Sequence, residues 1–255
     1  MWHDIRLLNA VSSLLLALAL LALLAAGLWW LAQRPMFALK VIRVDGVPAV
    51  HLRRVNALTI RSTALPKIRG NLFTTNLDTV RVAFEAVPWV RKATVRREWP
   101  NALQVTIEEH QALGTWGDDG RLVSVKGDVF TANLDEAEED GVLPKFSGPE
   151  GSAAEVVARY RALQQWLEPI QQAPAEVQLS KRYAWMVKLD SGVTVELGRE
   201  QDATTLQQRV ARLVSVYPQL VARLQDRLES IDMRYPNGLA LKASGLKFGL
   251  NSKKK

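Results

Sequence analysis

The pattern of apolar and polar positions separates an apolar N-terminal segment from two regions with shorter periodic patterns. From Leu7 to Gln33 there is no charged residue, and the centre of this stretch is almost entirely Leu and Ala. About 20 apolar residues span a bilayer core as a helix, and Trp29 and Trp30 at one end suit the headgroup layer. A cleaved signal peptide has a shorter apolar region and a polar mature start. The pattern therefore favours a transmembrane helix at residues 11–32.

The region after this helix predicts a small domain that begins with a strand and a helix. The run "FALKVIRVDG" is rich in β-branched residues and ends in the turn residues Asp45 and Gly46, which is typical of a strand followed by a turn. The next segment, "AVHLRRVNALTI", places its apolar residues near helical spacing, so it predicts a helix.

A second helix and a hairpin complete this domain in the order β-α-α-β-β. Asn76 or Thr75 is the expected helix cap, and Pro88 is expected to end the helix. Its apolar stripe comprises Leu77, Val80, Phe84 and Val87. Two strands then meet at Pro100 and Asn101. On the first strand, one face is expected to hold Ala93, Val95 and Trp99. On the second strand, apolar and polar residues alternate cleanly, with Leu103, Val105 and Ile107 on one side.

Residues 111–245 predict a larger, mixed or antiparallel β domain with flanking helices. "WGDDGRLVSVKGDVF" has the turn residues of a meander of short strands, and "LPKFSGPEG" indicates a connector. Ser152 and Glu155 stand at capping-box spacing before a helical pattern. A hairpin turning at residues 190–192 follows, then a helix that Pro218 is expected to end. The last element is a hairpin with its turn at residues 236–238.

Charge is unevenly distributed along the chain, and this bears on the kind of partner. The formal net charge of the 255 residues is +7, but residues 34–107 carry 13 basic and 4 acidic side chains, whereas residues 108–150 carry 3 and 11. A basic region can face nucleic acid or an anionic lipid surface. A domain tethered beside a membrane favours lipid, so we expect no nucleic-acid partner. Cysteine is absent, which excludes disulfides and thiolate metal sites.

Candidate catalytic chemistry is sparse. The three histidines, His3, His51 and His110, show no ligand spacing for zinc. Neighbours in a strand point to opposite faces, so Glu108, Glu109 and His110 cannot all converge on one substrate. The acidic segment 135–140 lacks the alternating ligands of a calcium loop and is expected to be a solvated loop. No nucleophile elbow, phosphate loop or dinucleotide motif occurs. We therefore expect no enzyme, cofactor, metal or small-molecule substrate.

Binding through a strand edge is the alternative that the pattern supports. An extended partner can add to an unpaired edge by main-chain hydrogen bonds, and charges commonly protect such edges from wrong pairing. The basic side chains of the first domain's hairpin would do this and would favour an acidic partner; they are Arg91, Lys92, Arg96 and Arg97. The final strand, from Leu239 to Leu241, is the stronger candidate for a free edge, and Arg234 and Tyr235 beside it are residue types that dominate interface energetics.

The sequence also resembles a known family. The pieces "PWV", "VRR" and "WP" between residues 88 and 100 resemble the POTRA domain of the FtsQ/DivIB family of bacterial cell division proteins. Farther on, "LVSVKGDVF", "LGR" at 197–199 and the pattern D-RY-NG at 232–238 are similar to that family's β domain. The chain departs from the family's usual "RRAW" by having Tyr183 after Arg182, and it has Ala243 where the family sometimes has an aromatic residue.

The resemblance implies a fold, partners and a location. The fold would be α+β: a cytoplasmic tail (1–10), the transmembrane helix (11–32), a POTRA domain (37–110), a β domain (111–245) and a basic tail (246–255). The protein would be a single-pass scaffold of the divisome at the septum of the cell inner membrane, with its C-terminal domains periplasmic. Its partners would be FtsB and FtsL in a ternary complex, other divisome proteins and inner-membrane lipid. The partner-binding positions carried over are Arg182, Arg234, Tyr235, Asn237, Gly238, Leu239, Ala240 and Leu241.

Two other functions fit the same pattern. One is a POTRA-bearing transport or secretion factor that binds unfolded chains, and the other is a membrane-anchored envelope enzyme. The positive-inside rule taken alone would place the side of Arg34, Lys40 and Arg43 in the cytoplasm, but the rule weakens for long translocated domains. From the residues themselves the orientation stays open.

Overall fold

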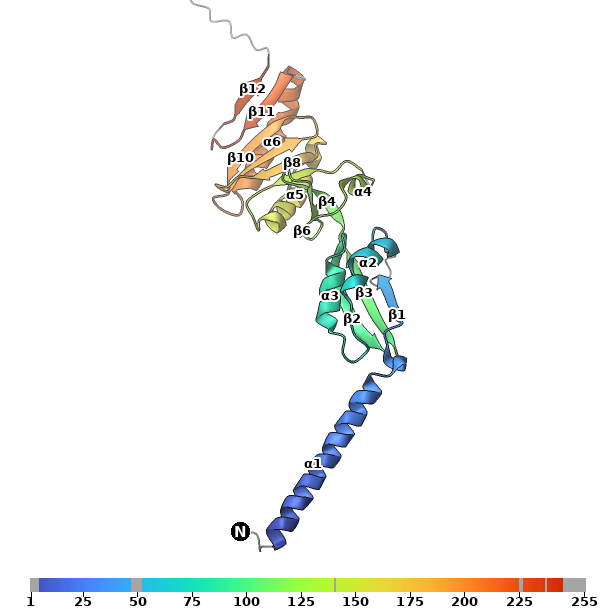
Figure 1. Ribbon diagram of the computed structural model, residues 1–255. Helices are drawn as coiled ribbons and strands as arrows, with labels where there is room; N and C mark the ends of the chain where they lie inside the picture. Colours follow the sequence, from blue (N-terminus) through green and yellow to red (C-terminus); the bar gives the residue numbers. More distant parts are fainter. Residues whose placement is uncertain (1–4, 47–51, 140, 225–226, 237, 245–255) are drawn as a thin grey trace, which may run out of the picture. The chain divides into compact units, whose positions relative to one another are not determined.

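The protein is an α+β molecule with an N-terminal apolar helix (Figure 1). The computed structural model describes residues 5–46, 52–139, 141–224, 227–236 and 238–244. The predicted basic tail and Asn237 therefore lie outside the described residues. Contacts divide the chain into two compact units, Met1–Glu109 and His110–Lys255.

Helix α1 runs from Ile5 to Ala32, so it begins before the predicted residue 11. Within it, Asn9–Leu31 forms a stretch of 23 residues that is long and apolar enough to cross a membrane. The described side chains of this stretch are exposed, as expected of a helix whose apolar surface faces lipid. A single turn of 3-10 helix, η1 (Pro35–Phe37), leads from α1 into the first soluble domain.

The first soluble domain has the predicted order β-α-α-β-β. Its elements are β1 (Val41–Gly46), α2 (Ala57–Thr63), η2 (Leu65–Lys67), α3 (Leu77–Glu85), β2 (Val90–Glu98) and β3 (Ala102–Glu109). The strand order is β1-β3-β2, with β1 parallel and β2 antiparallel to β3. Leu103, Val105 and Ile107 on β3 are fully buried, as their alternation predicted.

The first helix of this domain is shorter than predicted. Helix α2 begins only after Asn56, whose side chain accepts a hydrogen bond from the backbone N–H of Thr59 (2.8 Å). The N–H groups of Arg53, Arg54 and Val55 instead donate to the Glu109 carboxylate, at 2.6–3.0 Å. The prediction of a helix through residues 52–55 was wrong because a carboxylate from another strand satisfies these backbone donors.

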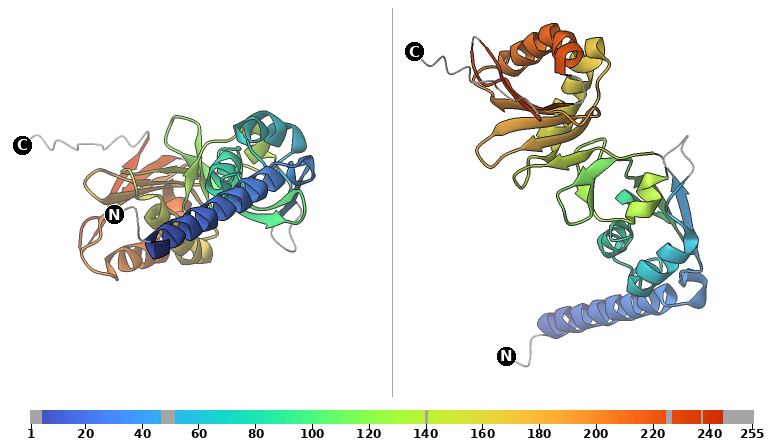
Figure 2. Two further views of the ribbon diagram at one scale, coloured as in Figure 1. Left: turned by 60° about the horizontal axis from the view of Figure 1, so that its bottom comes forward. Right: turned by 90° about the horizontal axis from the view of Figure 1, so that it is seen from above.

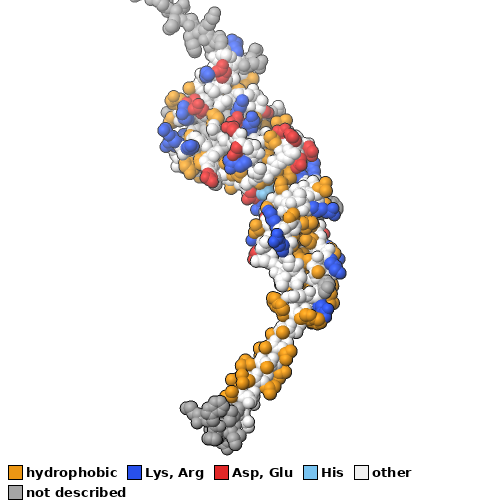
Figure 3. Space-filling model, in the orientation of Figure 1, with side chains coloured by type: hydrophobic (Ala, Val, Ile, Leu, Met, Phe, Trp, Pro, Cys, Tyr) orange, Lys and Arg blue, Asp and Glu red, His pale blue; other side chains and the backbone are white. Residues whose placement is uncertain are grey.

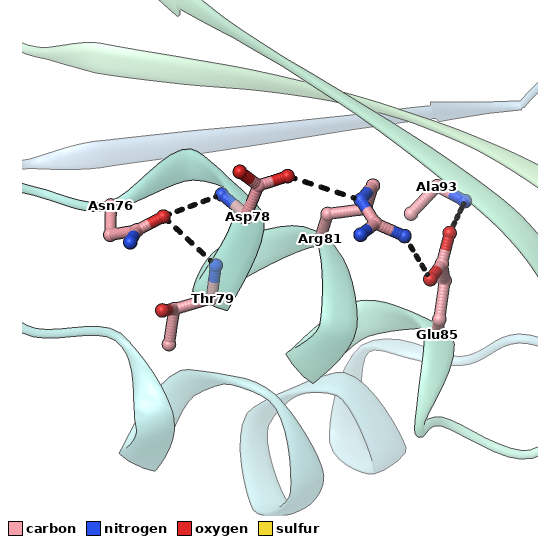
Figure 4. Close-up of polar contacts among 6 residues, drawn as sticks. All are labelled: Asn76, Asp78, Thr79, Arg81, Glu85 and Ala93. Carbon is pink, nitrogen blue, oxygen red and sulfur yellow. Dashed lines mark hydrogen bonds and ion pairs between the residues drawn. The ribbon is translucent and has the colours of Figure 1, made fainter.

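Helix α3 is capped and tied to the sheet by side chains (Figure 4). Asn76 accepts hydrogen bonds from the N–H groups of Asp78 (2.9 Å) and Thr79 (3.3 Å), so it is the cap. Arg81 bridges Asp78 and Glu85, and Glu85 in turn accepts a hydrogen bond from the N–H of Ala93 on β2 (3.3 Å). Because the predicted stripe is buried at Val80, Phe84 and Val87, the helix packs on the sheet through that face.

The second soluble domain is built on nine described strands in the order β12-β11-β10-β9-β8-β7-β4-β5-β6. Its helices α5 (Ala153–Leu167) and α6 (Thr205–Leu224) cover one face of the sheet (Figure 2). The core between them includes Phe146, Trp185 and Leu206. The strands are β4 (Ala112–Trp116), β5 (Arg121–Ser124), β6 (Val129–Phe130), β7 (Lys145–Ser147), β8 (Pro174–Leu179), β9 (Ala184–Leu189), β10 (Thr194–Arg199), β11 (Leu228–Asp232) and β12 (Ala240–Ala243).

Local expectations failed at four places in this domain. The acidic segment is not a plain loop, because Asn133 caps a short helix, α4 (Leu134–Glu138), whose Ala137 is buried. Strand β7 lies within the predicted connector. The Ser152 hydroxyl donates to the carbonyl of Pro149 (2.6 Å) instead of forming a capping box. Helix α6 continues through Pro218.

Candidate partner-binding edge of the β domain

Strand β12 forms one end of the nine-stranded sheet. It pairs antiparallel with β11, Leu241 lying opposite Ile231 and Ala240 opposite Asp232, and it has no second neighbour among the described residues. Residues 233–239 connect the two strands, so the connection is longer than the predicted three-residue turn. An edge strand of this kind presents unpaired backbone N–H and C=O groups to a second chain.

Arg234 is held tightly at the start of this connection. Its guanidinium donates to both carboxylate oxygens of Asp232, at 2.9 and 2.6 Å, and lies 3.0 Å from the carboxylate of Glu196 on β10. The hydrogen bond from Arg234 lowers the pKa of Asp232, and the same bond raises the pKa of Arg234. A bidentate pair fixes the orientation of the guanidinium plane as well as the position of its charge.

The backbone of β10 makes room for the Arg234 side chain at Gly198. Gly198 follows an irregularity in the β9–β10 register and has a φ of +74°, and a Cβ there would come within 2.8 Å of Arg234 Cγ. Two arginines of α6 brace the same region. Arg209 donates to the carbonyls of Leu197 and Arg199 at 2.6 and 2.8 Å, and Arg212 donates to the carbonyl of Pro236. Side-chain hydrogen bonds therefore hold the chain at Arg234 and Pro236, shortly before β12 begins.

Side chains of the predicted site differ in how far they are exposed. Tyr235 is 54% and Leu241 40% exposed, whereas Leu239 is half-buried and packs against the core. Gly238 and Ala240 are exposed. On β12 itself, Lys242 forms an ion pair with Glu229 of β11 (2.9 Å). The edge therefore offers one aromatic and one aliphatic side chain beside its backbone groups.

Arg182 is not on the edge strand, although the family resemblance grouped it with the residues near that strand. It is exposed in the turn between β8 and β9. The strand pairings place Ala184 beside Arg199, and Glu196 beside Asp232, so this turn lies at the same end of the sheet as Arg234. Two strand spacings of about 4.8 Å separate β9 from β11. The structure thus brings Arg234 and Tyr235 close to the start of β12 and leaves Arg182 at the flank.

The basic hairpin of the first domain lies at a sheet edge, as predicted, but two of its arginines also contact their own domain. Strand β2 is an edge strand, but Arg97 donates to the carbonyls of Leu72 (2.6 Å) and Thr75 (3.0 Å), and Arg91 lies 3.3 Å from the Glu108 carboxylate. Both side chains therefore bind parts of their own domain. The charges that were expected to select a partner contribute instead, at least at these two positions, to the domain's internal structure.

The Glu108–His110 triplet also has structural contacts. Glu108 contacts Arg91, and Glu109 accepts the three backbone hydrogen bonds described above. The His110 ring stacks on Phe130, with ring centroids 4.0 Å apart. Among the residues that the structure describes, no group of three or more His, Asp or Glu side chains is arranged to hold a metal ion.

The first soluble unit belongs to a recognised class of domain. Residues 40–110 match the model of the POTRA domain, FtsQ-type, and residues 114–234 match that of the cell division protein FtsQ/DivIB, C-terminal. The molecule thus combines a candidate membrane anchor, a POTRA domain and a β domain.

Whole-chain relatives agree with these matches. The chain is 54% identical to the cell division protein FtsQ of Burkholderia pseudomallei, over 97% of this chain and 96% of that protein. It is 40% identical to FtsQ of Bordetella pertussis (94% and 92% covered) and 36% identical to FtsQ of Nitrosospira multiformis (96% and 100% covered). The chain belongs to the FtsQ/DivIB family of cell division proteins. These names refer to cell division and to no transport or enzymatic activity.

Proposed function

We propose that this cell division protein binds FtsB and FtsL through strand β12, with both soluble domains in the periplasm at the division septum. The observation that carries the proposal is the single pairing of β12, which within the described residues pairs with β11 alone. An extended segment of a partner can add as a tenth strand, because main-chain hydrogen bonding requires only an accessible edge.

The side chains around the edge supply the specificity. Tyr235 and Leu241 are exposed enough to contact a partner strand, and aromatic residues in such positions contribute disproportionately to binding. Arg234 presents a fixed guanidinium beside them, already paired with Asp232 and Glu196, while the exposed Arg182 places a further positive charge at the same end of the sheet. The charge of Arg182 favours an acidic segment and discourages basic ones. We assign the main-chain contact to Leu239–Leu241 and the selection of partner to Arg234 and Tyr235. Gly238 has no side chain that could obstruct the partner, and Asn237 stays a predicted contact residue.

Disulfide cross-linking in cells tests the edge and the topology together. The chain has no cysteine, so Lys242→Cys on β12 provides a single thiol, to be combined with single cysteines along FtsB. Paired strands bring Cα atoms to about 5 Å, within disulfide range. We expect spontaneous cross-links at FtsB positions two residues apart, because alternate residues share a face. Spontaneous formation also requires an oxidising compartment such as the periplasm.

Lys188→Cys is the matched control. Lys188 is also an exposed lysine on this sheet, but β9 is already paired on both sides, with Glu176 and Thr194 opposite it. We expect no cross-link from position 188. Equal cross-linking from both positions, or none from 242 with an added oxidant, would refute docking on β12. Cross-linking from 242 that occurs only with an added oxidant would place this domain outside the oxidising compartment.

A further inference from the structure

Three aromatic rings form a cluster at the end of the POTRA domain where the chain enters from α1. Phe37 lies edge-to-face with Phe73 and with Trp99, at centroid distances of 5.0 and 5.7 Å, and Phe73 and Trp99 are 6.0 Å apart. These rings come from the entry segment, from the turn that precedes α3 and from the tip of the β2–β3 hairpin. Residues distant in sequence thus form one surface.

The cluster is exposed, which is unusual for so much apolar area. Of the three rings, Trp99 is 68% and Phe73 47% exposed, and Phe37 is buried; Met36, which precedes Phe37 in the chain, is 57% exposed. The expectation that Trp99 shares the inner face of the hairpin was therefore wrong. Hydrophobic side chains gather at this end of the domain in Figure 3. Contiguous exposed apolar patches usually mark an interaction surface.

Backbone hydrogen bonds hold the cluster rigidly. The N–H of Leu72 donates to the carbonyl of Phe37 (2.9 Å), and the N–H of Lys40 donates to that of Asn101 (3.0 Å). Arg97 joins the hairpin to the turn through the carbonyls of Leu72 and Thr75. The three rings are therefore presented by a fixed scaffold. Such a surface binds without first ordering a loop, which lowers the entropy cost.

Chain connectivity keeps the cluster close to the membrane that α1 would cross. Four residues separate Ala32, the end of α1, from Phe37, and the five Cα–Cα steps between them reach at most about 17 Å when extended. This segment is not extended, since Gln33, Arg34 and Phe37 donate backbone hydrogen bonds three residues back. The headgroup layer is several ångströms thick on each side of the core. The cluster is therefore within reach of the headgroups.

The charges around the cluster also suit a lipid surface. Arg34 lies over the Trp30 ring, 3.5 Å from its centroid, and Arg34, Lys40 and Arg69 are all exposed. Glu98, the acidic neighbour of Trp99, is paired with Arg43. Indole and phenyl rings with basic side chains between them are the composition of surfaces that lie in a membrane interface. A protein partner would not require the patch to be next to the span.

We propose that Met36, Phe73 and Trp99 insert into the headgroup layer of the bilayer that α1 spans, and so set the orientation of the POTRA domain on the membrane. The inference rests on α1 being the membrane span and is independent of what binds β12. With contacts from separate segments of the domain, the surface would resist tilting, which a flexible tether alone would not do.

Spin labels on single cysteines test the proposal in the full chain. The protein is reconstituted into nanodiscs of phosphatidylethanolamine and phosphatidylglycerol, and collisions of each label with oxygen and with a water-soluble nickel chelate are measured. Phe73→Cys reports the cluster. Leu58→Cys is the matched control, because Leu58 is 76% exposed on α2. Leu58 follows the segment bound to Glu109, at the opposite end of the eight-residue β3 from Trp99. Leu21→Cys, in α1, reports the span itself.

We expect the ratio of oxygen to nickel collisions at position 73 to be several-fold higher than at position 58 and to approach the ratio at position 21. Adding Trp99→Ser should lower the ratio at position 73 and leave position 21 unchanged. Equal ratios at 73 and 58 would overturn the proposal, as would a label at 73 shielded from both reagents, which would indicate a protein contact. An aqueous ratio at 21 would overturn the span and, with it, this inference.

Discussion

At the scale of single residues, Arg234 shows how a predicted contact also has a role within its own chain. Its donors are directed to Asp232 and Glu196, so its charge is largely satisfied before any partner arrives. The pairing positions the connection to β12. We therefore interpret Arg234 as a residue that presents the edge and adds selectivity. A partner then meets a guanidinium whose geometry is already fixed, which reduces the entropy lost on binding.

This pairing predicts a measurable pH effect. The hydrogen bond from Arg234 lowers the pKa of Asp232 in the folded protein, so the pair contributes stability above the ordinary aspartate pKa, about 4. That contribution is lost as the pH falls through the lowered pKa. In Arg234→Gln we expect the pKa of Asp232 to rise, as measured by carboxyl NMR titration. Asp202, whose pKa is lowered by Thr204, is the internal control and should not change. An unchanged pKa at Asp232 would contradict the assignment.

At the scale of elements, simple patterns predicted the outlines well where burial is one-sided. The alternation on β3 and the stripe of α3 are local signals; burial confirmed the alternation fully and the stripe at Val80 and Phe84, whereas Leu77 is half-buried. Strand β7 is only three residues long and pairs in parallel with β4 and β8, so its sequence carries too few alternations to be recognised. Short elements whose pairing depends on neighbours distant in the chain are therefore the ones that the sequence pattern does not predict.

The candidate site divides in the same way. The last strand and its flanking Arg234 and Tyr235 are recognisable from residue type and from the family pattern. The role of Glu196 is not, because it arises from the parallel register that places Glu196 opposite Asp232. Gly198 is similar, since its need for a positive φ follows from the irregular pairing of β9 and β10. The pattern therefore predicted the last strand, Arg234 and Tyr235, whereas the contacts that hold them arise from strand pairings that only the folded chain brings about.

Helix α6 gives a prediction at this scale. A proline normally breaks a helix because it lacks a donor and its ring clashes with the carbonyl four residues earlier. Here α6 continues past Pro218, since Tyr217 is buried with its hydroxyl near Ser191 (3.0 Å), and Leu220 and Leu224 pack on the core. Pro218→Ala restores the donor to the Val214 carbonyl. We expect a gain of about 1 kcal/mol in the free energy of unfolding, measured by denaturant unfolding. A loss would mean that the proline ring itself is needed for packing.

At the scale of the whole molecule, each soluble unit has its own core, and the chain passes from one to the other between Glu109 and His110. Glu109 closes the first unit, because its carboxylate gathers the N–H groups of Arg53, Arg54 and Val55. His110 opens the second by stacking on Phe130. Adjacent residues thus stabilise different units, and this predicts that the two units lose structure separately.

Replacing Glu109 tests this separation in the full chain. In Glu109→Gln a neutral amide replaces the charged acceptor of three backbone hydrogen bonds, and we expect a loss of about 1–3 kcal/mol in the POTRA domain. Hydrogen exchange should become faster in the segment 53–55 and in β2 and β3, while α5 and α6 keep their protection. Glu108→Gln is the matched control: Glu108 has a side chain 29% exposed and makes an ion pair with Arg91, so it should have a smaller effect. Faster exchange in α5 and α6 as well would show that the two units unfold as one, because a defect confined to the first unit's hydrogen bonds would then have spread to the second unit's core.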